Sequence, residues 1–287
     1  MKRTKRVLGL ALAAVMCMGL LAGCGGTPSN SDTADETSGT ETSEKVLNIA
    51  TIGETTTLSP LYMIADNRPT QKLLYEGLVK YVDGEIQPVL AEDWELSEDG
   101  TQLTFYLRQG VTFHDGEPFN AEAAIANIES WHINPSFASL PGVVNYTNIE
   151  AVDEYTIRLT YDTPYFAYIN DFCWPDVCTM ISPKLITQGD FQTVNGYAGT
   201  GPYIYDEYVA GQYTTFVRNE NYWGEQPYYD KIVAKYIPDN ASRVQALQTG
   251  EIDLIYGSAE LSYEDYNQAI ACLLYTSDAA DDRISVD

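Results

Sequence analysis

Short alternating segments that meet at Asp-Gly turns constrain the fold of this chain more than any other feature. Residues 94–107 alternate apolar and polar side chains on both sides of the turn Ser97-Glu98-Asp99-Gly100. Residues 78–89 do the same around Asp83-Gly84. Alternation is typical of half-buried strands, and Asp-Gly is a common two-residue hairpin turn. The pattern therefore predicts antiparallel hairpins.

Helical segments stand between the predicted strands. The clearest covers 120–131, where Asn120 is a candidate N-cap and Ala124, Ile125 and Ile128 share one face. Other helices are predicted over 67–75 and 240–249. Other strands are predicted over 46–52, 149–152, 155–159, 214–217, 232–237 and 252–255. Mixed strands and helices without an internal repeat predict an α/β (mixed α+β) fold.

The N-terminus has the features of a secretory signal. A basic head is followed by an apolar stretch over 7–21 and by Leu21-Ala22-Gly23-Cys24. The apolar stretch is too short to cross ~30 Å of hydrocarbon comfortably. We therefore predict a signal peptide over 1–23 rather than a membrane span. The ending resembles the lipobox of bacterial lipoproteins, which implies cleavage before Cys24 and lipid attachment to its sulfur.

The segment after Cys24 is predicted to be a tether. Residues 25–44 are rich in Ser, Thr, Asp, Glu and Gly and contain no aromatic residue. Such a composition cannot bury enough apolar surface to offset the entropy of ordering. We expect 24–45 to form a lipidated, flexible tether between the membrane and the folded part.

The charge balance excludes one class of partner. The chain has 41 acidic and 16 basic residues and a formal net charge of −25. Binding to a phosphate backbone needs a basic face, so nucleic acid is not expected as a partner. An acidic surface favours solubility and does not by itself identify a ligand.

Two cysteines and two histidines remain to be explained within the folded part. Cys173 and Cys178 are close enough in sequence for a local disulfide outside the cytoplasm, and two buried free thiols are the alternative. His114 and His132 are the only histidines, so zinc-type spacing is absent. We predict no metal site and no cofactor.

Several motifs follow one another along the chain. The longest runs from Ala91 to Gly116 and ends in Phe113-His114-Asp115-Gly116. The others lie at 117–122, 199–203, 218–224 and 237–255. Together they resemble the signature of family 5 bacterial solute-binding proteins, the oligopeptide, dipeptide and nickel-binding group. The resemblance covers 46–267. We interpret His114 as a hydrogen-bonded turn residue rather than a catalytic or metal-binding one.

The resemblance implies a periplasmic-binding-protein type II-like clamshell, with only lobe one in this chain. Residues 46–82 and 199–257 would form the core of lobe one, and 83–198 an inserted subdomain. Residues 258–271 would begin a truncated lobe two. Residues 272–287 fit no family pattern and resemble a translated sequencing adapter, so we interpret them as a non-native tail.

The resemblance leaves the ligand open between peptides and a nickel chelate. The motifs are most similar to the nickel-binding branch, yet Asp176 and Thr179 replace the arginines expected there. Arg68 lies on a loop that should face the cleft, where it could pair with a ligand carboxylate. The candidate ligand-binding residues are Tyr62, Met63, Arg68, Trp131, His132, Trp174 and Tyr203. For each aromatic residue among them, packing in the core is the alternative to contact with a ligand.

The implied function is solute capture for import. The family delivers small molecules or peptides to the permease subunits of an ABC transporter. We expect a monomer anchored by lipid to the extracytoplasmic face of the cell membrane, at the cell surface or in the periplasm. A peptide-binding receptor or chaperone on the same fold is the alternative. An enzyme is not expected, because no catalytic triad, carboxylate pair or phosphate loop occurs at usable spacing.

Overall fold

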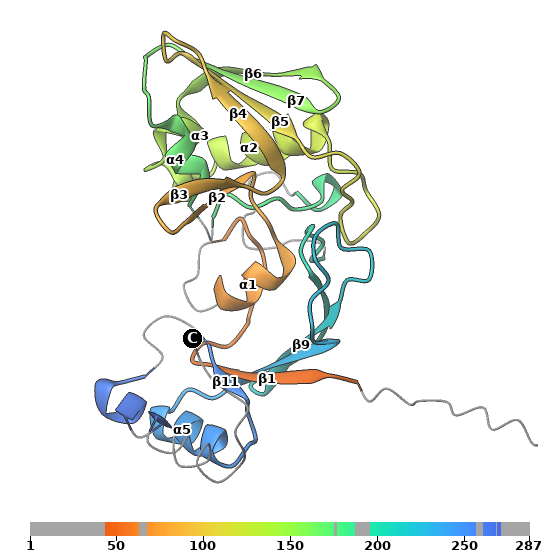
Figure 1. Cartoon of the computed structure of the whole chain (residues 1–287), viewed down its shortest axis with the longest axis vertical. Helices are drawn as coiled ribbons and strands as arrows, with labels where there is room; N and C mark the ends of the chain where they lie inside the picture. The colour runs from red at the N-terminus through yellow and green to blue at the C-terminus, as the bar shows by residue number, and fades with distance from the viewer. Residues whose placement is uncertain are drawn as a thin grey trace, which may run out of the picture. The chain divides into compact units, whose positions relative to one another are not determined.

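The computed structural model of the chain describes residues 44–62, 68–174, 177–186, 196–256, 261–267 and 269–270 (Figure 1). Within these ranges the strands form a five-stranded sheet, a four-stranded sheet and a two-stranded hairpin. No helix in these ranges combines the length and apolar character that a membrane span requires. The mixed α/β class predicted from the sequence is confirmed.

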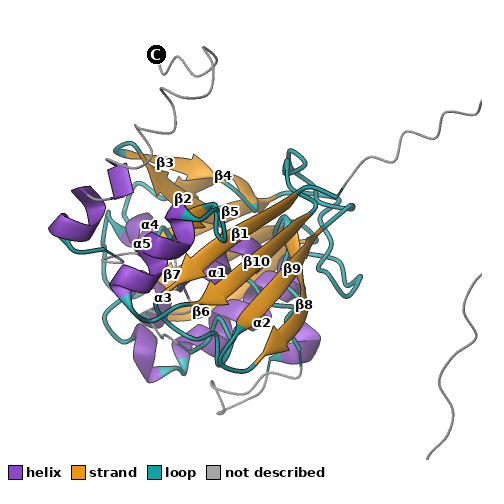
Figure 2. Ribbon diagram, turned by 90° about the horizontal axis from the view of Figure 1, so that it is seen from below, coloured by secondary structure: helices purple, strands orange, loops and turns teal. Residues whose placement is uncertain are grey.

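The five-stranded sheet joins the start of the folded part to a segment far along the chain. Its strands are ordered β11-β1-β10-β9-β8, and Figure 2 shows β1, β10, β9 and β8 side by side. β1 lies parallel to β10 and β11, whereas β8, β9 and β10 are antiparallel. The strands are β1 (Val46–Thr51), β8 (Tyr203–Val209), β9 (Tyr213–Arg218), β10 (Lys231–Tyr236) and β11 (Leu254–Ile255).

Most of this sheet was predictable, and β8 was not. β8 has Asp206 and Glu207 at its centre, and its pairing with β9 shifts register between Tyr205 and Glu207. This irregularity breaks the apolar–polar alternation by which strands are recognised. Helix α5 (Asn240–Gln248) connects β10 to β11, and Asp239 caps it by accepting a hydrogen bond from the Ser242 N–H.

The four-stranded antiparallel sheet has the order β4-β5-β7-β6 and is covered by α2. Alternation along β7 directs Ile157, Leu159 and Tyr161 into the core. Asn120 caps α2 as predicted, because its side chain accepts a hydrogen bond from the Ala123 N–H at 3.0 Å. The elements are β4 (Ala91–Leu96), β5 (Gln102–Leu107), α2 (Ala121–His132), α3 (Pro141–Val144), β6 (Tyr146–Asp153), β7 (Thr156–Tyr161) and α4 (Tyr168–Phe172).

A helix and a hairpin connect the two sheets. Helix α1 (Arg68–Leu74) precedes β2 (Val79–Val82) and β3 (Glu85–Pro88). The turn at Asp83 and Gly84 has φ values of 53° and 89°, which is the backbone that a two-residue hairpin turn requires. The hairpin predicted from Asp-Gly is therefore confirmed.

Close approach of two backbones fixes the junction between α1 and β8. A Cβ atom at Gly199 would lie 2.0 Å from the Leu74 carbonyl oxygen, so no side chain fits there. The Gly201 N–H donates to the same carbonyl oxygen at 2.9 Å. The glycines at 199 and 201 therefore allow this segment to cross the end of α1 at close range.

Candidate functional site

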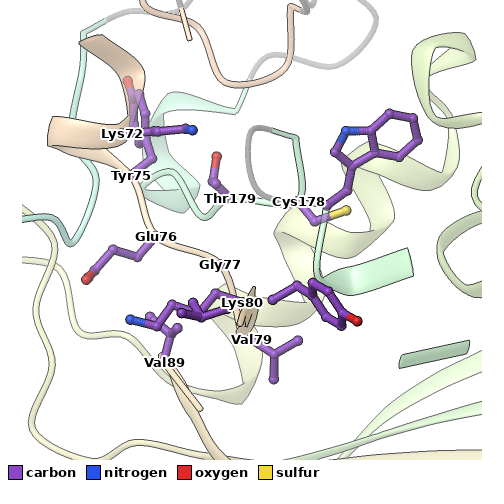
Figure 3. A pocket seen from close by; sticks show the side chains of 12 residues that line it. Lys72, Tyr75, Glu76, Gly77, Val79, Lys80, Val89, Cys178 and Thr179 are labelled. Carbon is purple, nitrogen blue, oxygen red and sulfur yellow. The ribbon is translucent and has the colours of Figure 1, made fainter. Parts of the chain in front are cut away.

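A cavity of about 270 Å³ lies beside the end of α1, the β2–β3 hairpin and the segment that follows α4 (Figure 3). Three charged residues, Lys72, Glu76 and Lys80, line it together with Trp174 and Thr179. It therefore combines charged groups with an aromatic wall, which is the usual make-up of a pocket for a small solute.

Gly77 brings the walls of this cavity together. Its backbone forms an antiparallel bridge with Thr179, and the Met180 N–H donates to the Glu76 carbonyl oxygen at 2.8 Å. A Cβ atom at Gly77 would lie 2.7 Å from the Cys178 carbonyl oxygen. The segment with Thr179 can lie against the end of α1 only because Gly77 has no side chain.

Glu76 has a structural role at the back of the cavity. Its carboxylate accepts hydrogen bonds from Thr200 Oγ1 at 2.9 Å, Tyr222 OH at 2.7 Å and Trp223 Nε1 at 2.8 Å. Burial raises the pKa of Glu76 above 4.5, although these three donors and the charge of Lys80 act in the opposite direction. With its oxygens engaged in this way, Glu76 holds the chain together and is not the group that meets a solute.

Lys72 and Lys80 supply the accessible charge of the cavity. Both side chains are exposed, and they are the positively charged residues among those that line it. Lys72 lies in the last turn of α1, where a positive charge complements the helix dipole. Two ammonium groups beside an exposed aromatic ring suit an organic solute that carries a carboxylate.

Trp174 and Tyr81 form a ridge between this cavity and a second one of about 490 Å³, because both residues line both cavities. The Trp174 side chain is 41% exposed and that of Tyr81 is 58% exposed. The structure therefore places the predicted ligand-binding residue Trp174 at a cavity wall, with its ring open to contact.

Comparison with known proteins decides the family. The family model described as "Bacterial extracellular solute-binding proteins, family 5 Middle" matches residues 85–278. The chain belongs to this family. It is 38% identical over 209 residues to the nickel-binding periplasmic protein of Escherichia coli (strain K12), a match that covers 71% of this chain and 40% of that protein.

Solved structures of family 5 proteins agree with this assignment. NikA from Brucella suis in complex with Fe(III)-EDTA is 33% identical, with a TM-score of 0.72 over 78% of this chain and 46% of that one. DppA from Helicobacter pylori in complex with the peptide STSA is 27% identical, with a TM-score of 0.63 over 72% and 45%. The likeness to the nickel branch and the expected type II-like fold are confirmed, and the chain spans less than half of each of these relatives.

Two predicted ligand-binding residues of this family 5 chain are instead core residues. Trp131 is fully buried and stacks on Phe137 with ring centroids 5.8 Å apart. Tyr203 is buried in the core of the five-stranded sheet, and its hydroxyl donates to the Tyr229 carbonyl oxygen at 3.1 Å. Neither ring offers a surface to a solute, so the prediction is corrected to core packing for both.

The other predicted residues lie away from the two cavities or outside the described part. His132 is exposed at the end of α2 and packs against Tyr146 with ring centroids 4.5 Å apart. Tyr62 is half-buried, and its N–H donates to the Ser59 carbonyl oxygen. Neither lines the cavities described above. Met63, the side chain of Arg68 and Cys24 lie outside the described residues.

Cys173 and Cys178 are buried free thiols in the structure. The Cys173 thiol donates to the Ile169 carbonyl oxygen and the Cys178 thiol to that of Asp171, each at 3.4 Å. Burial raises the pKa of Cys173 to about 11 and raises that of Cys178 further. Of the two alternatives open from the sequence, the structure therefore has the free thiols and not the disulfide.

His114 holds two parts of the backbone together. The Gly199 N–H donates to Nδ1 at 3.3 Å, so the ring proton lies on Nε2, which donates to the Gly201 carbonyl oxygen at 2.9 Å. Burial lowers the pKa of His114 from its usual value and so favours the neutral ring. Among the described residues, no group of three or more His, Cys, Asp or Glu is arranged to hold a metal ion.

Sequence reasoning missed the residues that surround Trp174. Lys72, Lys80 and Tyr81 lie on elements that were predicted, but no motif marks them as neighbours. Glu76 did carry a signal, because it follows the helix predicted over 67–75. An acidic residue at a helix C-terminus is unfavourable without specific partners, and its three donors are those partners.

Proposed function

We propose that this family 5 protein captures a small solute outside the cytoplasm and delivers it to the permease subunits of an ABC transporter. The observation that carries the proposal is the cavity of about 270 Å³, where the exposed Trp174 ring and the ammonium groups of Lys72 and Lys80 border one space. The family's solute-binding character agrees with this arrangement.

The solute is a peptide or a metal chelate. The Escherichia coli relative is named for nickel, the Brucella suis structure holds Fe(III)-EDTA, and the Helicobacter pylori structure holds a peptide. EDTA chelates and peptides both carry carboxylates, which Lys72 and Lys80 suit as charge-assisted donors. The chain acts in this proposal as a binding protein and not as an enzyme.

Binding would act through a closed state of the whole protein. A solute that contacts two lobes binds the closed arrangement more tightly than the open one and so stabilises it. The permease then recognises the closed arrangement. We propose that the protein works as a monomer and that Cys24 carries the lipid that keeps it at the membrane. The Leu21-Ala22-Gly23-Cys24 sequence after an apolar stretch supports the anchor.

Equilibrium dialysis of the whole protein, with both lobes present, tests solute capture. The probes are a mixture of short peptides and, separately, nickel with histidine, and mass spectrometry measures what the protein retains. We expect retention of one class and about a tenfold loss of affinity in Trp174→Ala, because a central aromatic contact is removed. The control is Tyr228→Ala, an exposed ring outside both cavities. Retention of neither class would contradict the proposal, as would unchanged binding by Trp174→Ala.

Metabolic labelling with radioactive palmitate tests the anchor. The full chain should incorporate label and sediment with membranes, and Cys24→Ala should do neither. Cys173→Ala is the matched control, since it removes a cysteine that lies in the folded core. Equal labelling of Cys24→Ala and the unmodified chain would show that Cys24 is not the lipid site.

A further inference from the structure

The second cavity, of about 490 Å³, has a different character from the first. Lys72 and Lys80 line the first cavity, whereas the charged residue that lines the second is Asp171. Ser139 and Asn170 line it as well. A positively charged wall and a negatively charged wall thus lie on opposite sides of the ridge made by Tyr81 and Trp174.

The backbone of α3 holds the Asp171 carboxylate in place. The Gly142 N–H donates to Asp171 Oδ2 at 2.6 Å. Helices α3 and α4 approach closely here, since a Cβ atom at Gly142 would lie 2.6 Å from the Tyr168 carbonyl oxygen. The carboxylate is therefore held by a main-chain donor. The position of that donor does not depend on the rotamer of another side chain.

The fixed carboxylate keeps capacity for a ligand. A carboxylate offers about four lone-pair sites for hydrogen bonds. Within the described residues the Asp171 side chain accepts one hydrogen bond, from the Gly142 N–H. Burial raises the pKa of Asp171, which means that its negative charge is only partly solvated. A positively charged group placed in this cavity would offset that loss of solvation.

The rest of the cavity suits a primary ammonium group. An ammonium group has three donors and no acceptor. Besides the Asp171 carboxylate, the side chains of Ser139 and Asn170 carry neutral acceptor oxygens. The exposed rings of Tyr81 and Trp174 add faces that attract cations.

We propose that the second cavity binds the ammonium group of a zwitterionic solute, such as a short peptide with a free N-terminus, whose carboxylate is held by Lys72 and Lys80 across the Trp174 ridge. This inference rests on the proposed function and narrows its solute class. An anionic metal chelate has no group to pair with Asp171 and would be repelled by its charge.

NMR titration of the full chain tests the inference at neutral pH, because the shifts of protein resonances give a dissociation constant even for weak binding. The probes are glycyl-leucine and N-acetyl-glycyl-leucine, which differ in the ammonium group. We expect glycyl-leucine to bind at least about tenfold more tightly than its acetylated form, as for a lost charge-assisted hydrogen bond. Asp171→Asn should weaken the binding of glycyl-leucine by a similar factor and leave the binding of the acetylated form unchanged.

The matched control is Asp153→Asn. Asp153 also accepts one main-chain hydrogen bond, from the Tyr155 N–H at 2.8 Å, and an Asn keeps that acceptor at either position. The control removes the same charge from the same subdomain and should bind glycyl-leucine like the unmodified chain. Equal binding of both probes, or an unchanged affinity in Asp171→Asn, overturns the inference and leaves the proposed solute capture standing. Failure of glycyl-leucine to bind at all overturns it too, whereas solute capture is judged by the dialysis with peptides and nickel.

Discussion

The indole N–H of Trp223 donates a hydrogen bond to the Glu76 carboxylate at 2.8 Å. The Arg108 guanidinium lies over the Trp223 ring, 4.5 Å from its centre. Arg108 Nε donates to the Val89 carbonyl oxygen at 3.0 Å. Trp223 therefore links the end of α1 to β5, which belongs to the four-stranded sheet. Glu76, which accepts this bond, also lines the candidate cavity.

Removal of the Glu76 carboxylate should destabilise the fold. Glu76→Ala leaves the donors of Thr200, Tyr222 and Trp223 without their acceptor, and we expect the free energy of unfolding to fall by about 3 kcal/mol. Glu76→Gln keeps one acceptor oxygen and should lose about 1 kcal/mol. Urea unfolding followed by tryptophan fluorescence measures both variants. A Glu76→Ala chain as stable as the unmodified one would show that the three bonds add nothing.

The same carboxylate should give the stability a pH dependence. Burial raises the pKa of Glu76 above 4.5, so the folded state binds the proton more tightly than the unfolded chain does. The contribution of Glu76 is then fully present below pH 4.5 and is lost as the pH rises through the folded pKa. The free energy of unfolding of the unmodified chain, minus that of Glu76→Gln, should fall over this range. A difference that is flat or rises with pH would contradict the raised pKa.

The contribution of His114 to the stability of the fold should depend on pH in the opposite way to that of Glu76. Its pKa is lowered below 6.5 by burial, so the neutral ring stabilises the fold above pH 6.5 and this contribution is lost as the pH falls through the folded pKa. His114→Phe removes the hydrogen bonds to Gly199 and Gly201 and should lower the free energy of unfolding by about 2 kcal/mol at pH values above 6.5. The loss should shrink at lower pH. Urea midpoints measured across the pH range check this, and a loss that grows on acidification would refute it.

The sequence predicted those elements whose signals are local. Asp83-Gly84 marks the β2–β3 turn, and Asn120 marks the start of α2, because each acts on its own backbone. The burial of Trp131 could also have been predicted from the sequence, since Trp131 shares the helical face of Ala124 and Ile128, and both of those residues are buried. Its prediction as a ligand contact gave the aromatic side chain more weight than its position on the helix.

The site itself was less predictable because its contacts join distant parts of the chain. Glu76 meets Thr200 across 124 positions and Tyr222 across 146. Tyr81 and Trp174 line the same cavities only because the β2–β3 hairpin and the segment after α4 come together in the folded chain. Periodicity and capping signals carry no information about such pairs, so the cavity appears only in three dimensions.

Gly199 offers a test of the junction between α1 and β8. A Cβ atom there would lie 2.0 Å from the Leu74 carbonyl oxygen and 2.6 Å from the Tyr75 ring, and the backbone of α1 cannot move away without losing the Gly201 N–H bond to Leu74. We expect Gly199→Ala to lower the free energy of unfolding by about 3 kcal/mol, as overpacking does at a rigid site. The control is Gly110→Ala, where a Cβ atom meets nothing within 4 Å and only the positive φ of 76° opposes it. That substitution should lose about 1 kcal/mol. Urea unfolding of both variants decides the matter, and equal losses would mean that the close approach at Gly199 relaxes freely.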